Sequence, residues 1–332
     1  MERQKTALVL GGTEFLGVHL VEALVAAGWD VTLFNRGVTQ PDLFDSLVRL
    51  RGDRDGDVKA LEGHTWDVVF DLSAFHPDQI DRTAAYLMDA CEHYVFVSSV
   101  SAYADFRRPG TTEEAPLGQL DGPVPTEVDG TSYGPLKALC EKRVTDLFTS
   151  RTIVRPTVVV GPHDPSDRLT YWVLRLSEAG QHIVPPDLDA AIQYIDARDL
   201  ATWMVHFGES RDNGIYNAAA DHTPFARFAQ VIADVADVEL RPVQLTEEQM
   251  VTEEVRPWLD LPMWLPPDDL DMRGFFYVDA ARAVGAGLST RPLADTVQDT
   301  LEWARARDAD ELRYGLSSER DAELVKRYGI TE

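Results

Sequence analysis

The sequence predicts a doubly wound α/β fold, in which helices cover both faces of a parallel sheet, with a smaller C-terminal lobe. A β-forming run at residues 7–10 leads into a glycine-rich turn, Gly11–Gly17, and then into an apolar helical run over residues 18–27. Gly28 suits the end of that helix, and a second strand is expected at residues 31–34. Strand-like and helical stretches continue to alternate along the chain, which is typical of βαβ units.

The length and composition fit one large α/β domain or two smaller lobes. The chain has 332 residues, of which 44% are hydrophobic, so it can bury a substantial core. Acidic residues outnumber basic ones by 56 to 31, which gives a net charge of −25. Such a field repels the phosphate backbone of nucleic acids, so we expect no nucleic-acid partner and attribute the charge to solubility. No apolar run is long enough to span a membrane, so no membrane partner is expected.

The cysteines, the histidines and the N-terminus indicate the compartment. Cys91 and Cys140 each lie in a helical pattern and look like small buried hydrophobic residues rather than a disulfide or a metal pair. The histidines lack the spacing of metal ligands. Residues 1–5 lead directly into the first strand, which leaves no room for a signal peptide. The sequence therefore predicts a reduced, cytoplasmic protein without a bound metal.

The glycine-rich turn points to a dinucleotide. Between a strand and a helix, such a turn directs backbone N–H groups and the positive end of the helix dipole at a phosphate. The alternative is a tight turn without a ligand, but Gly11–Gly17 lies between a strand and a helix, which is the context that nucleotide binding requires. At the end of the second strand, Asn35 replaces the acidic residue that binds an NAD ribose, and Arg36 follows. This pair favours NADP(H) over NAD(H), whereas an exposed arginine without a role is the common alternative.

The next elements repeat the order of strand and helix. Strands are expected at residues 47–50, 66–72 and 94–97, and an amphipathic helix at residues 79–91. The apolar strand at 94–97 suits a parallel sheet that is covered on both faces. A polar loop rich in Pro and Gly, residues 105–129, is long for a compact domain, so we expect a functional flap or a mobile loop.

A tyrosine and a lysine four residues apart suggest the chemistry. Tyr133 and Lys137 open a helix that continues to residue 148, with Thr131 or Ser132 as its cap, so both side chains share one face. An ammonium near a phenol stabilises the phenolate, which lowers the phenol pKa from about 10 toward the working pH. A serine hydroxyl from a neighbouring strand end then orients a substrate oxygen while a proton and a hydride move. A surface pair without a function is the simpler interpretation of these two residues alone, but they follow a dinucleotide turn and a serine-rich strand end.

Together, the turn, the Tyr-x-x-x-Lys pair and the serine-rich strand end resemble the extended short-chain dehydrogenase/reductase superfamily, also called the NAD-dependent epimerase/dehydratase family. The resemblance runs from about residue 6 to residue 305. It implies that Tyr133 is the acid/base, that Lys137 holds the nicotinamide ribose and tunes Tyr133, and that Ser99 positions the substrate oxygen. Asp53 is expected to accept from the adenine amine, or only to cap its turn. Contacts to the cofactor are expected from Gly11, Thr13, Phe15, Leu16, Gly17, Asn35, Arg36, Asp53, Arg54, Leu72, Ser73, Tyr133, Lys137, Pro156, Thr157 and Val158.

The resemblance also divides the chain. Residues 1–165 are expected to form a Rossmann-like dinucleotide-binding domain, to which residues 192–220 return. Residues 166–191 and 221–332 are expected to form mainly the substrate-binding lobe and a C-terminal tail. Further segments that look like family elements lie at 154–162, 193–201, 214–217, 278–283 and 293–303.

Three departures from the family pattern bear on the function. Glu14 replaces the middle glycine of the usual turn, and its carboxylate competes with a phosphate at the helix N-terminus. The form Gly-Gly-Thr-x-Phe-Leu-Gly resembles an atypical subgroup that includes chloroplast RNA-associated relatives. Val100 and Ser101 stand where family dehydratases carry acidic residues, so dehydration is not expected. Ile192 and Asp268–Asp269 stand where nucleotide-sugar epimerases carry arginines, and losing two such contacts removes roughly 3 kcal/mol or more of binding.

We therefore expect an NAD(P)-dependent oxidoreductase that reduces a ketone or oxidises an alcohol on a small molecule that is not a nucleotide sugar. One alternative is an NAD-dependent sugar epimerase that retains its cofactor. The other is a non-catalytic nucleotide- or RNA-associated protein.

Family members often pair through two helices, so a homodimer is expected through the helix at residues 79–91 and the helix after Tyr133.

The second lobe supplies weaker candidates for substrate contacts. Ser101 and His163 lie at predicted strand ends near the expected nicotinamide position. Tyr171 and Trp172 belong to an aromatic stretch that either walls a pocket for an apolar small molecule or forms an ordinary core.

Overall fold

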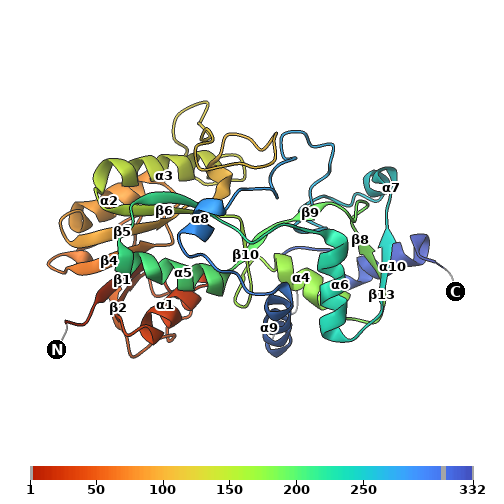
Figure 1. The fold of residues 1–332 in the computed structure, drawn as a ribbon, viewed down its shortest axis with the longest axis horizontal. Coiled ribbons are helices and arrows are strands. Elements are labelled where there is room, and N and C mark those ends of the chain that lie inside the picture. Colours follow the sequence, from red (N-terminus) through yellow and green to blue (C-terminus); the bar gives the residue numbers. More distant parts are fainter. Residues whose placement is uncertain (1–2, 308–311, 331–332) are drawn as a thin grey trace.

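A computed structural model describes residues 3–307 and 312–330, which form two lobes side by side (Figure 1). The central sheet of the N-terminal lobe has seven strands: β1 (Thr6–Leu10), β2 (Asp30–Asn35), β3 (Val48–Arg51), β4 (Trp66–Asp71), β5 (Cys91–Val97), β6 (Arg151–Pro156) and β11 (Gly214–Ala218). All neighbours are parallel, in the order β11-β6-β5-β4-β1-β2-β3. The strand order reverses direction between β1 and β4, and open α/β sheets bind ligands at such a switch point.

Helices cover both faces of this sheet, which confirms the predicted doubly wound α/β fold. Helices α1 (Leu16–Ala26) and α5 (Ala197–Ser210) lie on one face, and α2 (Pro77–Leu87) and α3 (Tyr133–Leu147) lie on the other (Figure 1). Two single-turn helices, η1 (Lys59–Leu61) and η2 (Val100–Ala102), lie in the connections.

The strands are apolar on both sides because both sides are covered. In β1, Ala7 and Val9 pack into the core shared with α1 and α5, whereas Leu8 and Leu10 pack into the core shared with α2 and α3. None of the four side chains is exposed to solvent. This alternation explains why the strand reads as a continuous apolar run.

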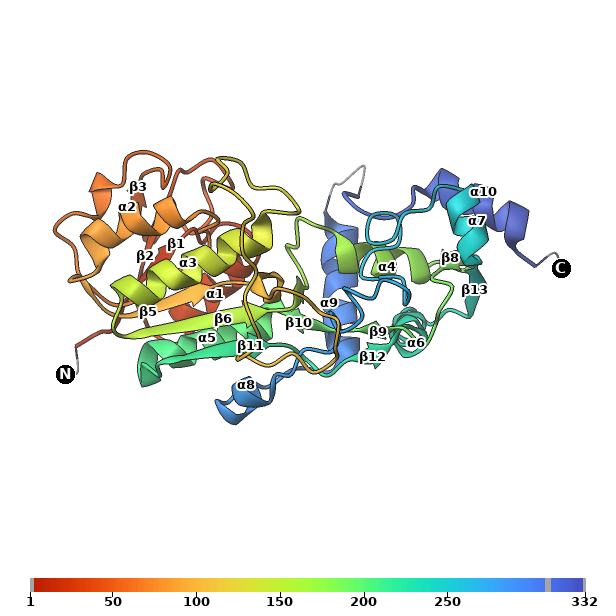
Figure 2. The same ribbon diagram turned by 90° about the horizontal axis from the view of Figure 1, so that it is seen from above.

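The second lobe has its own hydrophobic core. Its elements are α4 (Arg168–Leu176), β8 (Gly180–Val184), β9 (Ala191–Ile192), β12 (Thr223–Pro224), α6 (Phe225–Ala236), β13 (Leu240–Gln244), α7 (Glu247–Thr252), α9 (Leu293–Ala306) and α10 (Ser318–Tyr328). Between the lobes, β7 (Val158–Val160) pairs with β10 (Tyr194–Asp196). Helix α8 (Ala281–Gly285) returns to lie against β11, as Figure 2 shows.

The C-terminal helix and the long loop both attach to the second lobe. Helix α10 lies on β8, where the Asp321 carboxylate accepts a hydrogen bond of 3.0 Å from the backbone of Ile183. The loop expected at 105–129 begins beside residues 271–279, because the Phe106 N–H donates to the Asp271 carbonyl at 3.0 Å. This contact holds the start of the loop on the second lobe.

Two expected elements differ from the structure. Cys91 begins strand β5 instead of ending a helix, because α2 starts earlier at Pro77, after a capping box of His76 and Gln79, and ends at Leu87. The helical assignment of Cys91 is therefore wrong, whereas Cys140 is buried in α3 as expected. The segment at 154–162, expected as a strand and the loop after it, contains the end of β6 and the whole of a second strand, β7. Within the described residues, no helix is long and apolar enough to cross a membrane.

Candidate active site

The loop between β1 and α1 makes a cradle that only glycine permits. Gly11 and Gly12 adopt φ angles of 114° and 96°, in the region that side chains disfavour. A Cβ atom on Gly17 would lie 2.8 Å from the Cα atom of Gly12, so the first turn of α1 rests directly on the loop backbone. This shape leaves the backbone open to the close approach of a pyrophosphate.

A cavity of about 510 Å³ extends from this cradle along the carboxyl ends of β1, β2, β3 and β4. Its volume is in the range of cofactor sites. Of the expected cofactor contacts, those that line it are Gly11, Thr13, Phe15, Leu16, Gly17, Asn35, Arg36, Asp53, Arg54, Leu72 and Ser73. The lining also includes Phe75, Gln79 and Pro165, which the sequence analysis missed. Phe75 and Gln79 follow Ser73 within a few residues, so their closeness in sequence to that strand end could have identified them as cavity residues.

Glu14 stands on the exposed side of the cavity wall. Its backbone carbonyl accepts the Gly17 N–H at 2.9 Å, and the next residue, Phe15, has a φ of 41°. Within the described chain, the Glu14 side chain has no hydrogen bond or ion pair. Its carboxylate therefore places a free negative charge at the N-terminus of α1, beside the expected phosphate position.

Two arginines, Arg36 directly after β2 and Arg51 at the end of β3, lie near the position expected for the ribose. The Asn35 amide donates to the Gly11 carbonyl at 3.1 Å, and its oxygen accepts from Arg51 at 3.2 Å. Arg36 is exposed, lines the cavity and has no hydrogen bond or ion pair within residues 3–307 and 312–330. The site thus presents the guanidinium of Arg36, which has no hydrogen bond or ion pair within the described residues, and the guanidinium of Arg51, which is bound to Asn35.

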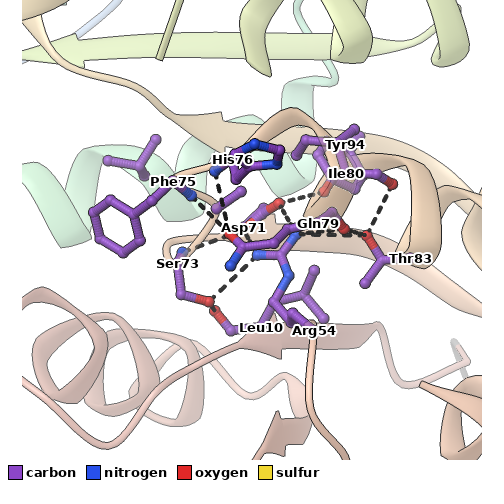
Figure 3. A network of polar contacts seen from close by, with 12 residues as sticks. Leu10, Arg54, Asp71, Ser73, Phe75, His76, Gln79, Ile80, Thr83 and Tyr94 are labelled. Carbon is purple, nitrogen blue, oxygen red and sulfur yellow. Dashed lines mark hydrogen bonds and ion pairs between the residues drawn. The ribbon is translucent and has the colours of Figure 1, made fainter. Parts of the chain in front are cut away.

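Arg54 forms a buried ion pair with Asp71 at the base of the cavity (Figure 3). One guanidinium nitrogen lies 2.8 Å from the Asp71 carboxylate, and the Tyr94 hydroxyl donates to the same carboxylate at 2.6 Å. Burial disfavours the charged carboxylate, but Arg54 outweighs it and holds the pKa of Asp71 below its usual value. Arg54 also donates to the Ser73 hydroxyl at 3.3 Å. Arg54 therefore lines the cavity with a guanidinium already engaged with the protein.

Gln79 joins this network to the start of α2 (Figure 3). Its carbonyl accepts from Arg54 at 3.3 Å, and its side-chain oxygen accepts the N–H of Phe75 at 2.8 Å. Its side-chain nitrogen donates to Asp55 at 2.8 Å. These contacts fix Phe75 at the cavity wall.

Tyr133 and Ser99 meet at the carboxyl end of β5. Tyr133 is the first residue of α3, and Ser132 is its N-cap residue, as expected, although the Ser132 side chain makes no capping hydrogen bond. The Asp129 carboxylate accepts the N–H groups of Thr131 and Ser132, just before the helix, at 2.9 and 2.8 Å. These short bonds to the carboxylate lower the pKa of Asp129 to about 2. The site residue Ser99 caps η2 by accepting the Ser101 N–H at 3.1 Å, and its hydroxyl lies near enough to the Tyr133 phenol to act on the pKa of that group.

The pKa of Tyr133 differs from the expectation. Burial raises it above the usual value of a phenol, and the nearby Ser99 hydroxyl and the positive charge of Arg168 oppose this rise. Lys137 is not among the groups that act on it. The expected lowering by Lys137 is therefore wrong.

Lys137 instead binds the ends of two strands. Its ammonium donates to the carbonyls of Ala74 and Val97 at 2.8 and 2.7 Å, and it lies over the rings of Phe96 and Phe75 at 4.4 and 5.3 Å. The side chain is only 2% exposed. Burial lowers the pKa of Lys137 to about 8.

The remaining expected cofactor contacts lie away from the cavity lining. Pro156 ends β6 and Val158 begins β7, with Thr157 between them. The Thr157 N–H donates to the Ala218 carbonyl at 3.0 Å, which is where the chain leaves the sheet toward the second lobe.

The weaker substrate candidates separate into two groups. Ser101 and His163 are half-buried, and the His163 ring lies 5.5 Å from that of His19 and 5.7 Å from that of Trp303. Tyr171 and Trp172 are fully buried in the core of the second lobe. The prediction that they contact a substrate is therefore wrong, and their aromatic stretch is core because α4 turns its apolar face toward α6 and α9.

Comparison with known proteins gives a match to one family model and a curated relative. Residues 7–219 match the model of the NAD dependent epimerase/dehydratase family. A curated relative, the chloroplast stem-loop binding protein of 41 kDa b of Arabidopsis thaliana, is 26% identical over 239 residues. That match covers 66% of this chain but only 59% of the relative, which is less than two thirds of its length.

Solved structures share the fold over nearly the whole chain. The enzyme WbmH of Bordetella bronchiseptica in complex with NAD+ is 16% identical with a TM-score of 0.66, covering 92% of this chain and 100% of the other. A putative epimerase from Burkholderia cenocepacia is 18% identical with a TM-score of 0.67, at the same coverage of 92% and 100%. UDP-glucose 4-epimerase of Thermotoga maritima with UDP-glucose is 18% identical with a TM-score of 0.64, covering 90% and 98%. At these identities the likeness shows the fold.

Proposed function

Because the chain belongs to the NAD-dependent epimerase/dehydratase family, by the match over residues 7–219, we propose that it is an NAD(P)-dependent oxidoreductase. The proposed reaction interconverts a ketone and an alcohol on a small molecule that is not a nucleotide sugar. Tyr133 is the proposed acid/base, with Ser99 beside it and Lys137 beneath it.

The position of Tyr133 is the observation that carries this proposal. Its ring lies 6.3 Å from that of Phe75, and Phe75 lines the nucleotide cavity. The Ser99 hydroxyl acts on the pKa of this phenol, so the two side chains lie near each other. A carbonyl oxygen that met both hydroxyls would therefore be held next to the cavity, where a reaction with a bound nicotinamide requires it.

The residues present fit a dinucleotide, since Gly11 and Gly12 adopt φ angles that side chains disfavour and line the cavity with their backbone, and Gly17 packs directly on Gly12. When bound, the nicotinamide supplies or accepts a hydride. In the direction of reduction, Tyr133 donates its proton to the substrate oxygen and Ser99 donates a hydrogen bond to the same atom. Burial raises the pKa of Tyr133 and keeps the phenol protonated at neutral pH, which suits a proton donor.

Lys137 supports this arrangement through its hydrogen bonds to two backbone carbonyls. Its two hydrogen bonds, to Ala74 and Val97, hold together the ends of β4 and β5. Phe75 follows one of these residues directly, and Ser99 lies two residues after the other. The lysine is thus proposed to position the wall of the cavity and the serine of the site.

The proposed cofactor is NADP(H), with NAD(H) as the alternative. Arg36 lines the cavity with a free guanidinium, and no acidic side chain stands at the end of β2, where Asn35 lies. Arginine recognises a phosphate through paired, charge-assisted hydrogen bonds. The 2′-phosphate of NADP(H) is the group that this end of the cavity suits.

A nucleotide sugar is disfavoured as the substrate, because other residues stand where the family's nucleotide-sugar epimerases carry arginines. Ile192 is buried in the core of the second lobe, with 1% of its surface exposed. The next residue, Gln193, is engaged with the backbone of Val278 at 2.9 Å in both directions. This position therefore offers a substrate diphosphate no positive charge.

Two other functions have support of their own. Structural neighbours that include a UDP-glucose 4-epimerase favour an epimerase that retains its cofactor. A curated relative named as a stem-loop binding protein favours a role with RNA. The net charge of −25 opposes RNA binding, and the position of Tyr133, whose ring lies 6.3 Å from that of the cavity residue Phe75, favours catalysis.

Deuterium transfer tests the proposal on a mixture of small molecules. The purified chain is incubated with a small-molecule extract and NADPH carrying deuterium at C4, on either face, and products are identified by mass spectrometry. The oxidoreductase predicts products that gain one hydrogen and one deuterium. The Tyr133→Phe variant should lose this transfer, whereas Tyr86→Phe, at a half-buried tyrosine of α2, should retain it.

The alternatives give other outcomes in the same experiment. An epimerase that re-reduces the same carbon with retained cofactor produces isomers of unchanged mass. A non-catalytic protein gives no new product with either variant. Either result contradicts the proposed function.

A further inference from the structure

Arg168 is a partly buried arginine without a partner. It is the first residue of α4 in the second lobe. Within residues 3–307 and 312–330, every other arginine that is at least partly buried has a hydrogen bond or an ion pair, but the Arg168 guanidinium has neither. Its Nε atom is buried without an acceptor. Buried polar atoms normally have partners, so this one calls for an explanation.

A shortage of acidic side chains does not explain it. The chain has 56 acidic and 31 basic residues, so carboxylates are abundant. The neighbouring Asp167 pairs with Arg307 at 2.6 Å, and the buried Asp164 accepts from Ser166 at 2.6 Å. The charge of Arg168 acts on Asp164 and opposes the rise of its pKa that burial causes, and one oxygen of that carboxylate has no hydrogen-bond partner, but no hydrogen bond or ion pair joins the two side chains. The N–H donors of Arg168 therefore have no acceptor among the described residues.

Two aromatic rings hold the Arg168 guanidinium in place. Its central carbon lies 5.3 Å from the ring of Trp258 and 4.9 Å from the ring of Tyr314. Cation–π contacts of this kind fix the guanidinium but use none of its N–H donors. A fixed fork of unused donors matches the geometry of a carboxylate or a phosphate.

The charge of Arg168 also acts on Tyr133, although one residue comes from α4 and the other from α3. It opposes the rise of the Tyr133 pKa that burial causes. The loop before α4 contributes Pro165 to the cavity wall. Arg168 thus follows the cavity residue Pro165 by three positions and lies within electrostatic reach of the proposed acid/base.

We propose that Arg168 binds an oxyanion group of the substrate, a carboxylate or a phosphate, and so places the reacting carbon beside Tyr133. This inference rests on the proposed function and narrows its substrate class to small anionic ketones or alcohols. Trp258 and Tyr314 position the guanidinium.

Anion binding tests this proposal without an enzymatic assay. The full chain, saturated with NADP+, is titrated with acetate, benzoate and inorganic phosphate, and binding is followed by thermal shift and by tryptophan fluorescence. Arg168→Met removes the charge while keeping a long side chain, and Arg168→Lys keeps the charge but loses the fork. Arg227→Met, at an exposed arginine of α6, is the matched control.

A carboxylate should bind to wild type and to Arg227→Met with equal affinity. Its affinity for Arg168→Met should be roughly 10- to 100-fold lower, and its affinity for Arg168→Lys should lie between these values. If phosphate but not the carboxylates shows this pattern, the oxyanion is a phosphate. Equal binding to wild type and Arg168→Met, or no binding to wild type, overturns the proposal.

The two proposals fail in different ways. In the deuterium assay, Arg168→Met should raise KM for the substrate while leaving kcat nearly unchanged. If deuterium transfer is absent but the anion still depends on Arg168, only the proposed reaction is wrong. If deuterium transfer depends on Tyr133 but gives neutral products, and gives them equally well in wild type and Arg168→Met, the proposed anion site is wrong.

Discussion

Arg54 and Asp71 form an ion pair that is almost completely inaccessible to solvent, at the base of the nucleotide cavity (Figure 3). The Arg54 side chain is 9% exposed and that of Asp71 is not exposed at all. Tyr94, Ser73 and Gln79 add further hydrogen bonds to the pair, and only the Arg54 Nε atom is left without an acceptor. A buried pair that is engaged in this way fixes the loop after β3 against the end of β4, and so shapes the cavity.

Asp71→Asn should destabilise the protein by about 3–5 kcal/mol, because it leaves the Arg54 charge buried without a counter-charge. Urea denaturation measures the difference. The double variant Arg54→Met/Asp71→Asn should recover part of the loss, because it removes the unpaired charge. Asp271→Asn breaks the exposed Arg107–Asp271 pair and should cost less than about 1 kcal/mol. Equal costs for the two single variants would contradict this account.

The lowered pKa of Lys137 predicts a dependence of stability on pH. The unfolded lysine keeps its proton up to about 10.5, whereas the folded one loses it at about 8. Between these values the unfolded state binds more protons, so the free energy of unfolding rises with pH, by about 3 kcal/mol in all. This rise should appear in wild type relative to Lys137→Met between pH 8 and 10.5.

Lys142→Met is the control for this measurement. Lys142 lies on the same helix, is exposed and pairs with Asp146 at 2.6 Å. Its substitution should leave the pH dependence of wild type in place. A constant difference between wild type and Lys137→Met across the window would show that the buried lysine does not titrate there.

Arg36→Gln should weaken NADP+ binding roughly 10- to 100-fold and leave NAD+ binding almost unchanged, because the lost contacts are to the 2′-phosphate. Isothermal titration calorimetry with both cofactors measures the two affinities. Arg305→Gln, at an exposed arginine of α9, is the control and should change neither. If both cofactors weaken equally in Arg36→Gln, the arginine contributes general attraction and not selectivity.

We also predict a homodimer through α2 and α3, which pack together on one face of the sheet. Ala85 is exposed on α2, and a charge there would be buried by such an interface. Ala85→Arg should therefore shift the protein to monomers in light scattering at micromolar concentration, whereas Ala322→Arg on α10 should not. A monomeric wild type would contradict the prediction.

Much of the fold follows from local patterns in the sequence. Strand β1 is apolar on both faces because both faces are covered, and the glycines of the next turn are those that its backbone requires. These constraints act within a few residues of one another. The helix boundary near Cys91 was harder to predict, because the residues from 88 to 97 are apolar enough for either element and pairing with β4 decides between them.

The parts of the site that sequence could not predict depend on contacts between distant segments. Lys137 and Tyr133 share a helix face, but Lys137 is held by carbonyls from β5 and from the residue after Ser73. Arg54 meets Asp71 because β3 and β4 end on the same edge of the sheet. Tyr171 and Trp172 are core because α4 packs against α6 and α9, and their composition alone does not distinguish a core from a pocket.

A crystal structure of the protein with NADP+ tests the central claim most directly. The account predicts the pyrophosphate on the backbone of the Gly11–Gly17 turn and the nicotinamide beside the hydroxyl groups of Tyr133 and Ser99. A dinucleotide excluded from the cavity by the Glu14 carboxylate, or a nicotinamide turned away from Tyr133, would contradict it.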